Sequence, residues 1–287
     1  MKKFLTFITT ALLSLSLVAC GSSQQTEQQT TDATTSQQSS SNTQEDSALA
    51  KIKQKGELVV ATSPDYPPYE FKTIENGKEK VVGFDISIAE EIAKDMGVDL
   101  HILELDFSGL LVSLNANKAD LVMAGMSPNP EREKAVDFSD VYYTAEQAIL
   151  IKSENNDEFT SVDSLSGKKI GVQKGSIQET LALEQLPNSK IVSLNKLTNL
   201  ILDLKAGNVD AVIVETPVAE GYVKQYPDLT ISSVKTKTDV DGCAIAIKKG
   251  NQDLVDQVNS TLRRLEEDGS MDKFFIEANE LLNNIPK

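Results

Sequence analysis

The sequence predicts an α/β protein with parallel-rich sheets that are flanked by helices. Short runs of β-branched residues alternate with helix-length segments from about residue 57 to residue 283, as expected for parallel α/β sheets. About 240 residues follow the polar N-terminal region, which is enough for two domains of ordinary size. One short pattern occurs in both halves. These observations favour two α/β units over a helical bundle or a β-sandwich.

The first half of the folded part predicts strand, hairpin, helix, strand, helix and strand in that order. Residues 57–62 form a β-branched strand, and Asn76-Gly77 between two extended runs predicts a hairpin turn. Apolar residues at helical spacing predict a helix over 84–96, which Gly97 ends. We expect strands over 98–105 and 119–124, and between them a helix that Ser108 caps and that runs to about residue 117.

The second half repeats this alternation and ends in helices. Strands are predicted over residues 169–173, 190–194 and 209–214, and helices over 176–186, 196–206, 216–226, 251–268 and 271–283. Gly207 ends one helix, Pro217 lies in the first turn of the next, and Gly269 separates the last two.

A short pattern recurs in the two halves at residues 117–124 and 207–214. The two copies read Asn-Lys-Ala-Asp-Leu-Val-Met-Ala and Gly-Asn-Val-Asp-Ala-Val-Ile-Val. Each copy predicts a helix end, a tight turn with an aspartate, and a buried strand. Two lobes of related design would produce this pattern, and so would the ordinary build of α/β units.

The N-terminal segment 1–20 has the features of a secretory signal. Its positive start, Met-Lys-Lys, precedes an apolar run at 4–18 that is too short for a spanning helix. Residues 17–20, Leu-Val-Ala-Cys, resemble a lipobox, after which Cys20 becomes the lipid-modified, palmitate-bearing first residue of the mature chain. An ordinary signal peptide with a chance cysteine, or a buried helix, is the alternative.

Composition limits the classes of function. Residues 21–50 are rich in Ser, Thr and Gln and predict a flexible tether. The net charge of −15 argues against nucleic-acid binding, which needs a basic surface. With Cys20 lipidated, Cys243 has no disulfide partner, and its apolar neighbours indicate a small core residue. His101 is expected to face the surface from a strand, and no pattern indicates a metal or an organic cofactor.

Polar side chains follow four of the predicted strands, where ligands bind in open α/β sheets. They are Ser63, Asp65, Tyr66 and Tyr69 after the first strand, Gly125, Ser127 and Arg132 after the strand at 119–124, Ser176 after the strand at 169–173, and Glu215 after the strand at 209–214. Arg132 can pair with a carboxylate through two N–H groups, and free amides at the Ser176 helix start add an anion site. Glu215 and the Ser127 hydroxyl would accept from an ammonium group. The sequence therefore predicts a site for a zwitterion, with Tyr66 and Phe107 around its side chain.

These residues also have plainer interpretations. Arg132 lies in the charged run 130–134 and could be solvated, and Glu215 could simply favour the start of the helix that follows it. Tyr66 could be a loop residue packed between prolines. The stretch 171–176 contains glycines but lacks P-loop spacing, which argues against a nucleotide site.

Five motifs resemble those of the polar amino-acid-binding proteins of ABC importers, solute-binding protein family 3. They are residues 61–71 (ATSPDYPPYEF), 82–88 (VGFDISI), 124–132 (AGMSPNPER), 137–143 (DFSDVYY) and 210–217 (DAVIVETP). The resemblance covers about residues 56–283. It implies a two-lobe periplasmic-binding-protein-like fold with the ligand cleft at the hinge between the lobes. Lobe 1 would comprise residues 51–144 and 241–287, lobe 2 would comprise 145–240, and strands near residues 145 and 240 would form the hinge.

The resemblance also implies roles for single residues. Arg132 matches the arginine that grips the α-carboxylate of the ligand, and Ser176 with the following amides matches the carboxylate contact from lobe 2. Gly125 and Ser127 match positions that contact the ammonium and carboxylate groups. Glu215 matches an acidic residue, commonly aspartate, that binds the ammonium group.

The side-chain end of the site departs from the family pattern. Tyr66 and Phe107 match the positions that flank the ligand side chain, but Ser63 stands where many relatives carry an aspartate. Asp65 and Asp85 keep negative charge nearby, which favours a basic amino acid.

The sequence therefore predicts a binding protein that captures a free polar L-amino acid, with arginine or lysine favoured over glutamine. It would deliver this ligand to a membrane permease that a separate ATPase serves, and hinge closure would bring Glu215 and Ser176 onto the ligand. We expect a monomer on the extracellular face of the cell membrane, held by its lipid anchor. The alternatives are a dehydratase or lyase with Glu215 or Asp85 as acid or base, and a nutrient-sensing lipoprotein.

Overall fold

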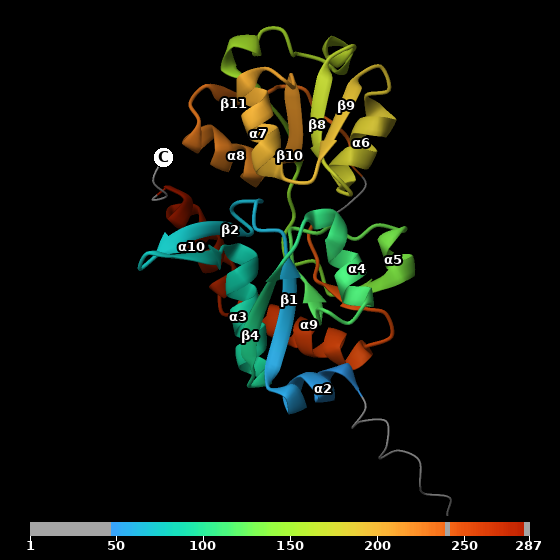
Figure 1. Ribbon diagram of the computed structural model, residues 1–287, viewed down its shortest axis with the longest axis vertical. Coiled ribbons are helices and arrows are strands. Elements are labelled where there is room, and N and C mark those ends of the chain that lie inside the picture. Colours follow the sequence, from blue (N-terminus) through green and yellow to red (C-terminus); the bar gives the residue numbers. More distant parts are fainter. Residues whose placement is uncertain (1–46, 239–241, 284–287) are drawn as a thin grey trace, which may run out of the picture. The chain divides into compact units, whose positions relative to one another are not determined.

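The computed structural model describes residues 47–238 and 242–283, which belong to one compact unit. The predicted signal segment, Cys20 and most of the predicted tether lie outside the described residues. Two five-stranded sheets with helices packed on them, and a separate β-hairpin, form the two-lobed α/β fold that the sequence predicts (Figure 1). No helix in the described part of the chain is long and apolar enough to cross a membrane.

Lobe 1 is built on a sheet with the strand order β4-β1-β5-β12-β6. Its strands are β1 (Glu57–Thr62), β4 (Asp99–Glu104), β5 (Leu121–Val122), β6 (Val136–Phe138) and β12 (Ala246–Lys248). Strand β1 pairs in parallel with β4 and β5, whereas β12 runs antiparallel to β5 and β6. Because β12 comes late in the sequence, lobe 1 contains two separate stretches of the chain.

Helices cover both faces of this sheet because successive strand residues point to opposite faces. Leu58 and Val60 of β1 pack in one cluster with residues of α3 and α9, and Val59 and Ala61 pack in another with α4. The helices of lobe 1 are α2 (Ala48–Lys55), α3 (Phe84–Met96), the 3-10 turn η1 (Phe107–Gly109), α4 (Leu110–Asn115), α5 (Arg132–Ala135), α9 (Gln252–Glu267) and α10 (Ser270–Asn283). The hairpin consists of β2 (Phe71–Glu75) and β3 (Lys78–Val82).

Lobe 2 is built on a sheet with the strand order β11-β7-β10-β8-β9. Its elements are β7 (Gln147–Lys152), η2 (Ser153–Asn155), η3 (Val162–Leu165), β8 (Lys169–Gln173), α6 (Ile177–Gln185), β9 (Lys190–Leu194), α7 (Leu197–Ala206), β10 (Ala211–Glu215), α8 (Thr216–Gln225) and β11 (Leu229–Ile231). Ala211 and Ile213 of β10 pack with α6, whereas Val212 and Val214 pack with α7 and α8 on the other face. Figure 1 shows these three helices around the sheet.

The two sheets share one plan. In each, one strand (β1 in lobe 1, β8 in lobe 2) pairs in parallel with the strand of the same sheet that comes next along the chain (β4 or β9). It also pairs in parallel with the strand of the repeated pattern (β5 or β10). That strand then pairs with an antiparallel partner, β12 in lobe 1 and β7 in lobe 2. The recurring sequence pattern therefore occupies equivalent places in two similar lobes.

The aspartate of the repeated pattern makes the same contacts in both lobes. The Asp120 N–H donates to the Val59 carbonyl at 2.8 Å, and its carboxylate accepts from the Val59 N–H at 2.9 Å. Asp210 makes the same two bonds with Lys169, at 2.8 and 2.7 Å. The aspartate thus fixes the turn before β5 against β1 in lobe 1, and the turn before β10 against β8 in lobe 2.

We expect D120A to lower the free energy of unfolding by about 1.5–3 kcal/mol, because the Val59 N–H loses a charged acceptor. Urea unfolding of the purified protein measures this change, and D99A is a matched control because Asp99 is exposed. If D120A and D99A unfolded at the same urea concentration, the role assigned to Asp120 would be wrong.

Two described segments connect the lobes and pair with each other. Tyr143 and Cys243 form an antiparallel bridge in which the Cys243 N–H donates to the Tyr143 carbonyl at 2.8 Å. At Gly242 φ is +102°, and a Cβ there would lie 2.2 Å from the Tyr143 carbonyl oxygen, so a side chain would force the two segments apart. The strand expected near residue 145 is β7, which belongs to the sheet of lobe 2. Residues 239–241, near the second expected strand, lie outside the described residues.

Most of the predicted elements are confirmed, and one cap is wrong. The strand at 57–62 and the helix at 84–96 match β1 and α3 at both ends. Ser108 does not cap a helix, because it lies inside the 3-10 turn η1 and α4 starts two residues later, at Leu110. His101 is exposed and Cys243 is buried, as expected. The short elements α2, α5, β6, β11 and β12 and the 3-10 turns η2 and η3 were not predicted.

Candidate functional site

A small cavity of about 10 Å³ lies between the two lobes. It is lined by Tyr66, Phe107, Ala124, Gly125, Ser127 and Arg132 from lobe 1, and by Gln173, Ser176, Ile177 and Gln178 from lobe 2. These residues follow the carboxyl ends of parallel strands, where open α/β sheets bind ligands. A cavity of this size holds roughly one water molecule, so the lobes are closed on each other in this structure.

Arg132 contributes a buried cation to this cavity. Its backbone N–H donates to the Asn129 side chain at 2.8 Å, which fixes the start of α5. Its guanidinium donates to the Ser127 carbonyl at 2.6 Å and to the Gly175 carbonyl of lobe 2 at 3.0 Å, and it lies over the Phe107 ring. Burial lowers the pKa of Arg132 to about 10. Because no ion pair with a described carboxylate balances it, this charge is suited to an anionic group of a ligand.

Gly125 forms the lobe 1 wall of the cavity in a conformation that favours glycine. Its φ is +52°, and a Cβ there would lie 3.2 Å from the Tyr66 ring. Its N–H donates to the Asp85 carboxylate at 2.9 Å. Asp85 is fully buried and does not line the cavity. It therefore supports Gly125 from behind, and its predicted part in ligand binding stays a prediction.

Glu215 is the last residue of β10 and is almost fully buried, with 2% of its surface exposed. Its Oε2 accepts from the Tyr69 hydroxyl at 2.6 Å, and its backbone N–H donates to the Tyr66 hydroxyl at 3.2 Å. The other carboxylate oxygen, Oε1, has the Cys243 thiol at 3.7 Å. Burial raises the pKa of Glu215 to about 7. A cation beside this carboxyl group would favour its ionised form.

Ser176 and Gln178 bring polar groups of lobe 2 to the cavity. The Ser176 hydroxyl caps α6 by accepting from the Glu179 N–H at 3.2 Å, so the neighbouring amides at the helix start remain available to an anion. The Gln178 amide donates to Gln147 at 2.9 Å and reaches the Tyr66 hydroxyl at 3.4 Å. Lobe 2 therefore contacts the aromatic wall of lobe 1 through Gln178.

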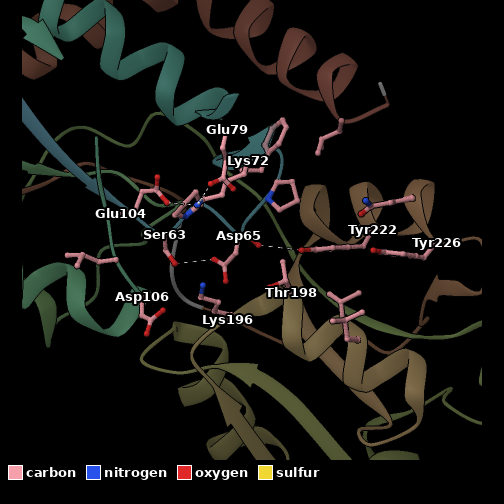
Figure 2. A pocket seen from close by; sticks show the side chains of 18 residues that line it. Ser63, Asp65, Lys72, Glu79, Glu104, Asp106, Lys196, Thr198, Tyr222 and Tyr226 are labelled. Atoms are coloured by element: carbon pink, nitrogen blue, oxygen red, sulfur yellow. Dashed lines mark hydrogen bonds and ion pairs between the residues drawn. The ribbon is translucent and has the colours of Figure 1, made fainter. Parts of the chain in front are cut away.

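A larger cavity of about 770 Å³ adjoins this site (Figure 2). The two cavities meet at Asp65 and Gln173. Asp65 lines the larger cavity, Gln173 lines the smaller one, and the Asp65 carboxylate accepts from the Gln173 side chain at 3.2 Å. Asp65 also accepts from the Ser63 hydroxyl at 3.1 Å, as Figure 2 shows, and from the Leu197 N–H at 2.7 Å. The charged residues of this lining are Asp65, Glu79, Glu104, Asp106, Lys72 and Lys196. Acidic side chains thus outnumber basic ones beside the cleft.

The structure brings most of the predicted site residues together. Those that line the small cavity are Tyr66, Phe107, Gly125, Ser127, Arg132 and Ser176. Glu215 contacts Tyr66, Ser63 lies in the larger cavity, and Asp85 lies behind Gly125. Sequence reasoning did not select Ala124, Gln173, Ile177 and Gln178. Their signal was positional: Gln173 ends β8, Ile177 and Gln178 open α6, and Ala124 follows the end of β5 by two residues.

The groups around the cavity are suited to a small molecule that carries both charges, which needs more room than the closed lobes leave here. Arg132 and the amides near Ser176 offer donors to a carboxylate, while Glu215 and the carbonyls around Ser127 offer acceptors to an ammonium group. Burial of both charges is favourable only if each finds a partner.

Comparison with known proteins identifies relatives that bind small solutes outside the cell. Residues 58–277 match the family model of bacterial extracellular solute-binding proteins, family 3. The arginine-binding extracellular protein ArtP of Bacillus subtilis is 36% identical over 276 residues, which cover 95% of this chain and 96% of ArtP.

Solved structures also resemble this chain closely. AbpA, an amino-acid ABC transporter substrate-binding protein from Streptococcus pneumoniae solved with L-arginine, is 44% identical with a TM-score of 0.80. That match covers 83% of this chain and 99% of AbpA. An ancestral amino-acid-binding protein described as a precursor of cyclohexadienyl dehydratase is 35% identical with a TM-score of 0.74, over 80% of this chain and 99% of its own. On its fold, its cleft and these matches, the chain belongs to the bacterial extracellular solute-binding proteins of family 3.

Proposed function

We propose that this protein binds a free L-amino acid between its lobes and delivers it to an ABC importer. The observation that carries the proposal is the buried Arg132 guanidinium, which bonds carbonyl oxygens of both lobes. A ligand carboxylate would replace these neutral acceptors with a charged one and form a stronger, bidentate contact. Glu215, whose Oε1 has only a thiol neighbour, would accept from the ammonium group.

L-arginine is the ligand that the neighbouring groups favour. Asp65 and Asp106 give the larger cavity an acidic lining beside the cleft, which suits a cationic side chain. Tyr66 and Phe107 line the small cavity and offer aromatic faces to a guanidinium group. The similar proteins ArtP and AbpA, which are described as arginine-binding and as bound to L-arginine, support the same choice.

A thermal-shift screen of the purified protein against all twenty L-amino acids tests the proposal. A ligand that binds only the native state raises the unfolding temperature as its concentration increases. We expect the largest shift with L-arginine and a smaller one with L-lysine. A larger shift with glutamine would support the binding function but contradict the choice of L-arginine as the ligand. No shift with any amino acid would contradict the function itself.

We propose transport in preference to catalysis or sensing. The relatives are described as solute-binding proteins, which supports delivery of an unchanged ligand. A dehydratase or lyase is the second candidate, because the Glu215 carboxyl group has a pKa of about 7 and could act as a general acid or base. Incubation with a cyclic hydroxy acid and analysis by mass spectrometry would show a dehydrated product only if catalysis occurs. Loss of arginine uptake after gene deletion would favour transport over sensing.

We propose that the lobes that close on the ligand are residues 51–144 with 241–287, and residues 145–240. The bridge between Tyr143 and Cys243 supports a hinge at these boundaries, since it joins the two connecting segments. The protein would act as a monomer with a separate permease and ATPase.

A lipid anchor at Cys20 completes the proposed function by holding the protein at the outer face of the membrane. We expect C20A to abolish incorporation of a palmitate analogue and to leave the protein unprocessed at the signal segment, because the lipidated thiol is absent. Metabolic labelling followed by membrane fractionation measures both effects. S22A, two residues further along the chain, is the control and should label normally. Equal labelling of C20A and S22A would rule out anchoring at Cys20.

A further inference from the structure

Two buried carboxyl groups lie behind the cavity and are not explained by ligand contact. Glu70 and Asp85 are both fully buried. Neither carboxyl oxygen of Glu70 accepts a hydrogen bond from a donor group among the described residues. An ionised carboxylate without any donor would be strongly unfavourable at this position.

Asp85 has a different environment from Glu70. It accepts from the Gly125 N–H at 2.9 Å and from the Tyr142 hydroxyl at 2.8 Å. These two donors favour the ionised form of Asp85, since hydrogen bonds to a carboxylate stabilise its charge. The Asp85 N–H donates at 2.9 Å to the carbonyl of Tyr69, the residue before Glu70, so the two acidic residues are neighbours. The donor that the Glu70 environment lacks can therefore be replaced by a hydrogen bond between the two carboxyl groups. Two carboxyl groups can form such a bond only if one of them carries a proton.

The proton belongs on Glu70, because Asp85 already has the two donors. Burial, followed by the negative charge of Asp85, raises the pKa of Glu70 well above its usual value. Burial raises the pKa of Asp85 only to about 6, since its bonds to Gly125, Tyr142 and Glu70 oppose the effect.

Among the described residues, no lysine, arginine or histidine forms an ion pair or a hydrogen bond with the side chain of Glu70 or Asp85. The titratable groups that face Glu70 and Asp85 are Asp65, Tyr66, Tyr142, Glu215 and Cys243. All of these are acids, phenols or a thiol, so none can neutralise a second negative charge. The geometry and the surroundings therefore both require one neutral carboxyl group.

We propose that Glu70 is held as a neutral carboxylic acid that donates its proton to ionised Asp85, and that the pair positions Gly125 and Tyr142 for ligand binding. The second part of this inference rests on the proposed amino-acid site. Gly125 lines the cavity in a left-handed conformation, and Tyr142 lies in a segment that connects the lobes. The hydrogen-bonded pair of Glu70 and Asp85 therefore connects Gly125, in the wall of the site, to Tyr142, in the segment between the lobes.

Infrared difference spectroscopy of the purified protein without ligand tests the proton directly. A protonated carboxylic acid has a C=O band that a carboxylate lacks. The E215Q variant is used so that Glu215 does not contribute to this band. We expect the band at pH 7 in E215Q, and we expect it to be absent from the double variant E215Q/E70Q. Labelling all glutamates with carboxyl ¹³C should shift the band in E215Q without altering Glu70. A band that labelled glutamate does not shift, or no band at all, would overturn the proposal.

L-arginine affinity tests the positioning role. We expect E70A to weaken binding about tenfold at pH 7, and E70Q to recover most of this loss because its amide N–H can donate to Asp85. The wild-type affinity should fall relative to that of E70Q as Glu70 ionises at alkaline pH, whereas E75Q, at an exposed position, should follow the wild type. Equal effects of E70A and E70Q at every pH would overturn the positioning role. If no amino acid bound, the infrared result would still decide the state of Glu70.

Discussion

Replacing Arg132 with alanine is expected to weaken L-arginine binding at least 100-fold, which corresponds to about 2.7 kcal/mol. Removal of the guanidinium takes away the charged partner proposed for the ligand carboxylate. It also leaves the Ser127 and Gly175 carbonyls without their present donor. Isothermal titration calorimetry of the purified variant measures the dissociation constant.

The matched control for this prediction is R263A. Arg263 is exposed and forms a surface ion pair with Asp140 at 3.2 Å, and such pairs contribute little to stability. R263A should bind L-arginine like the wild type. R132K should recover only part of the loss, because a lysine cannot form the planar bidentate contact. An R132A protein that bound within twofold of R263A would disprove the assignment of Arg132.

The second large effect is a pH dependence that comes from Glu215. The free protein holds this carboxyl group with a pKa of about 7, and only its ionised form pairs with an ammonium group. The affinity for L-arginine should therefore fall about tenfold for each pH unit below about 7, as the competent fraction decreases. E215Q should bind roughly 30-fold more weakly at pH 8 than the wild type, and its affinity should vary much less than that of the wild type between pH 5.5 and 8.

Glu215 should also affect the stability of the free protein, but with the opposite pH trend: stability should fall as the pH rises, whereas the affinity for L-arginine rises. The folded pKa of Glu215 lies above the ordinary value of 4.5, so the folded state binds more protons than the unfolded state between these pH values. Its contribution to the free energy of unfolding therefore decreases as the pH rises from about 4.5 to about 7. Urea unfolding of wild type and E215Q across this range measures the difference. Parallel curves for the two proteins would contradict the pKa assigned to Glu215.

The sequence predicted the fold well because its signals were local and regular. The helix at 84–96 has apolar residues at helical spacing and a glycine at its end, and both features are present in α3. The repeated pattern around Asp120 and Asp210 marked equivalent strands in two lobes. The Ser108 cap failed because a 3-10 turn at Phe107 begins the helical segment earlier, and no residue pattern distinguishes the two geometries.

The candidate site was predicted in part because its polar residues follow strand ends. Arg132, Ser127 and Ser176 were found in this way, and they meet at one cavity. The sequence could not show that Asp85 lies behind Gly125, since that contact joins residues forty positions apart. Gln173 was missed for a related reason, because its partner Asp65 belongs to the other lobe.

The central claim is that the cleft recognises the charged head group of an amino acid with both lobes. Titration of the purified protein with L-arginine and with agmatine, which keeps the guanidinium and amine but lacks the carboxylate, tests this claim most directly. We expect one L-arginine to bind per chain, and agmatine to bind at least 100-fold more weakly because Arg132 has no anion to pair with. Equal affinity for the two compounds, or no binding of L-arginine, would contradict the account.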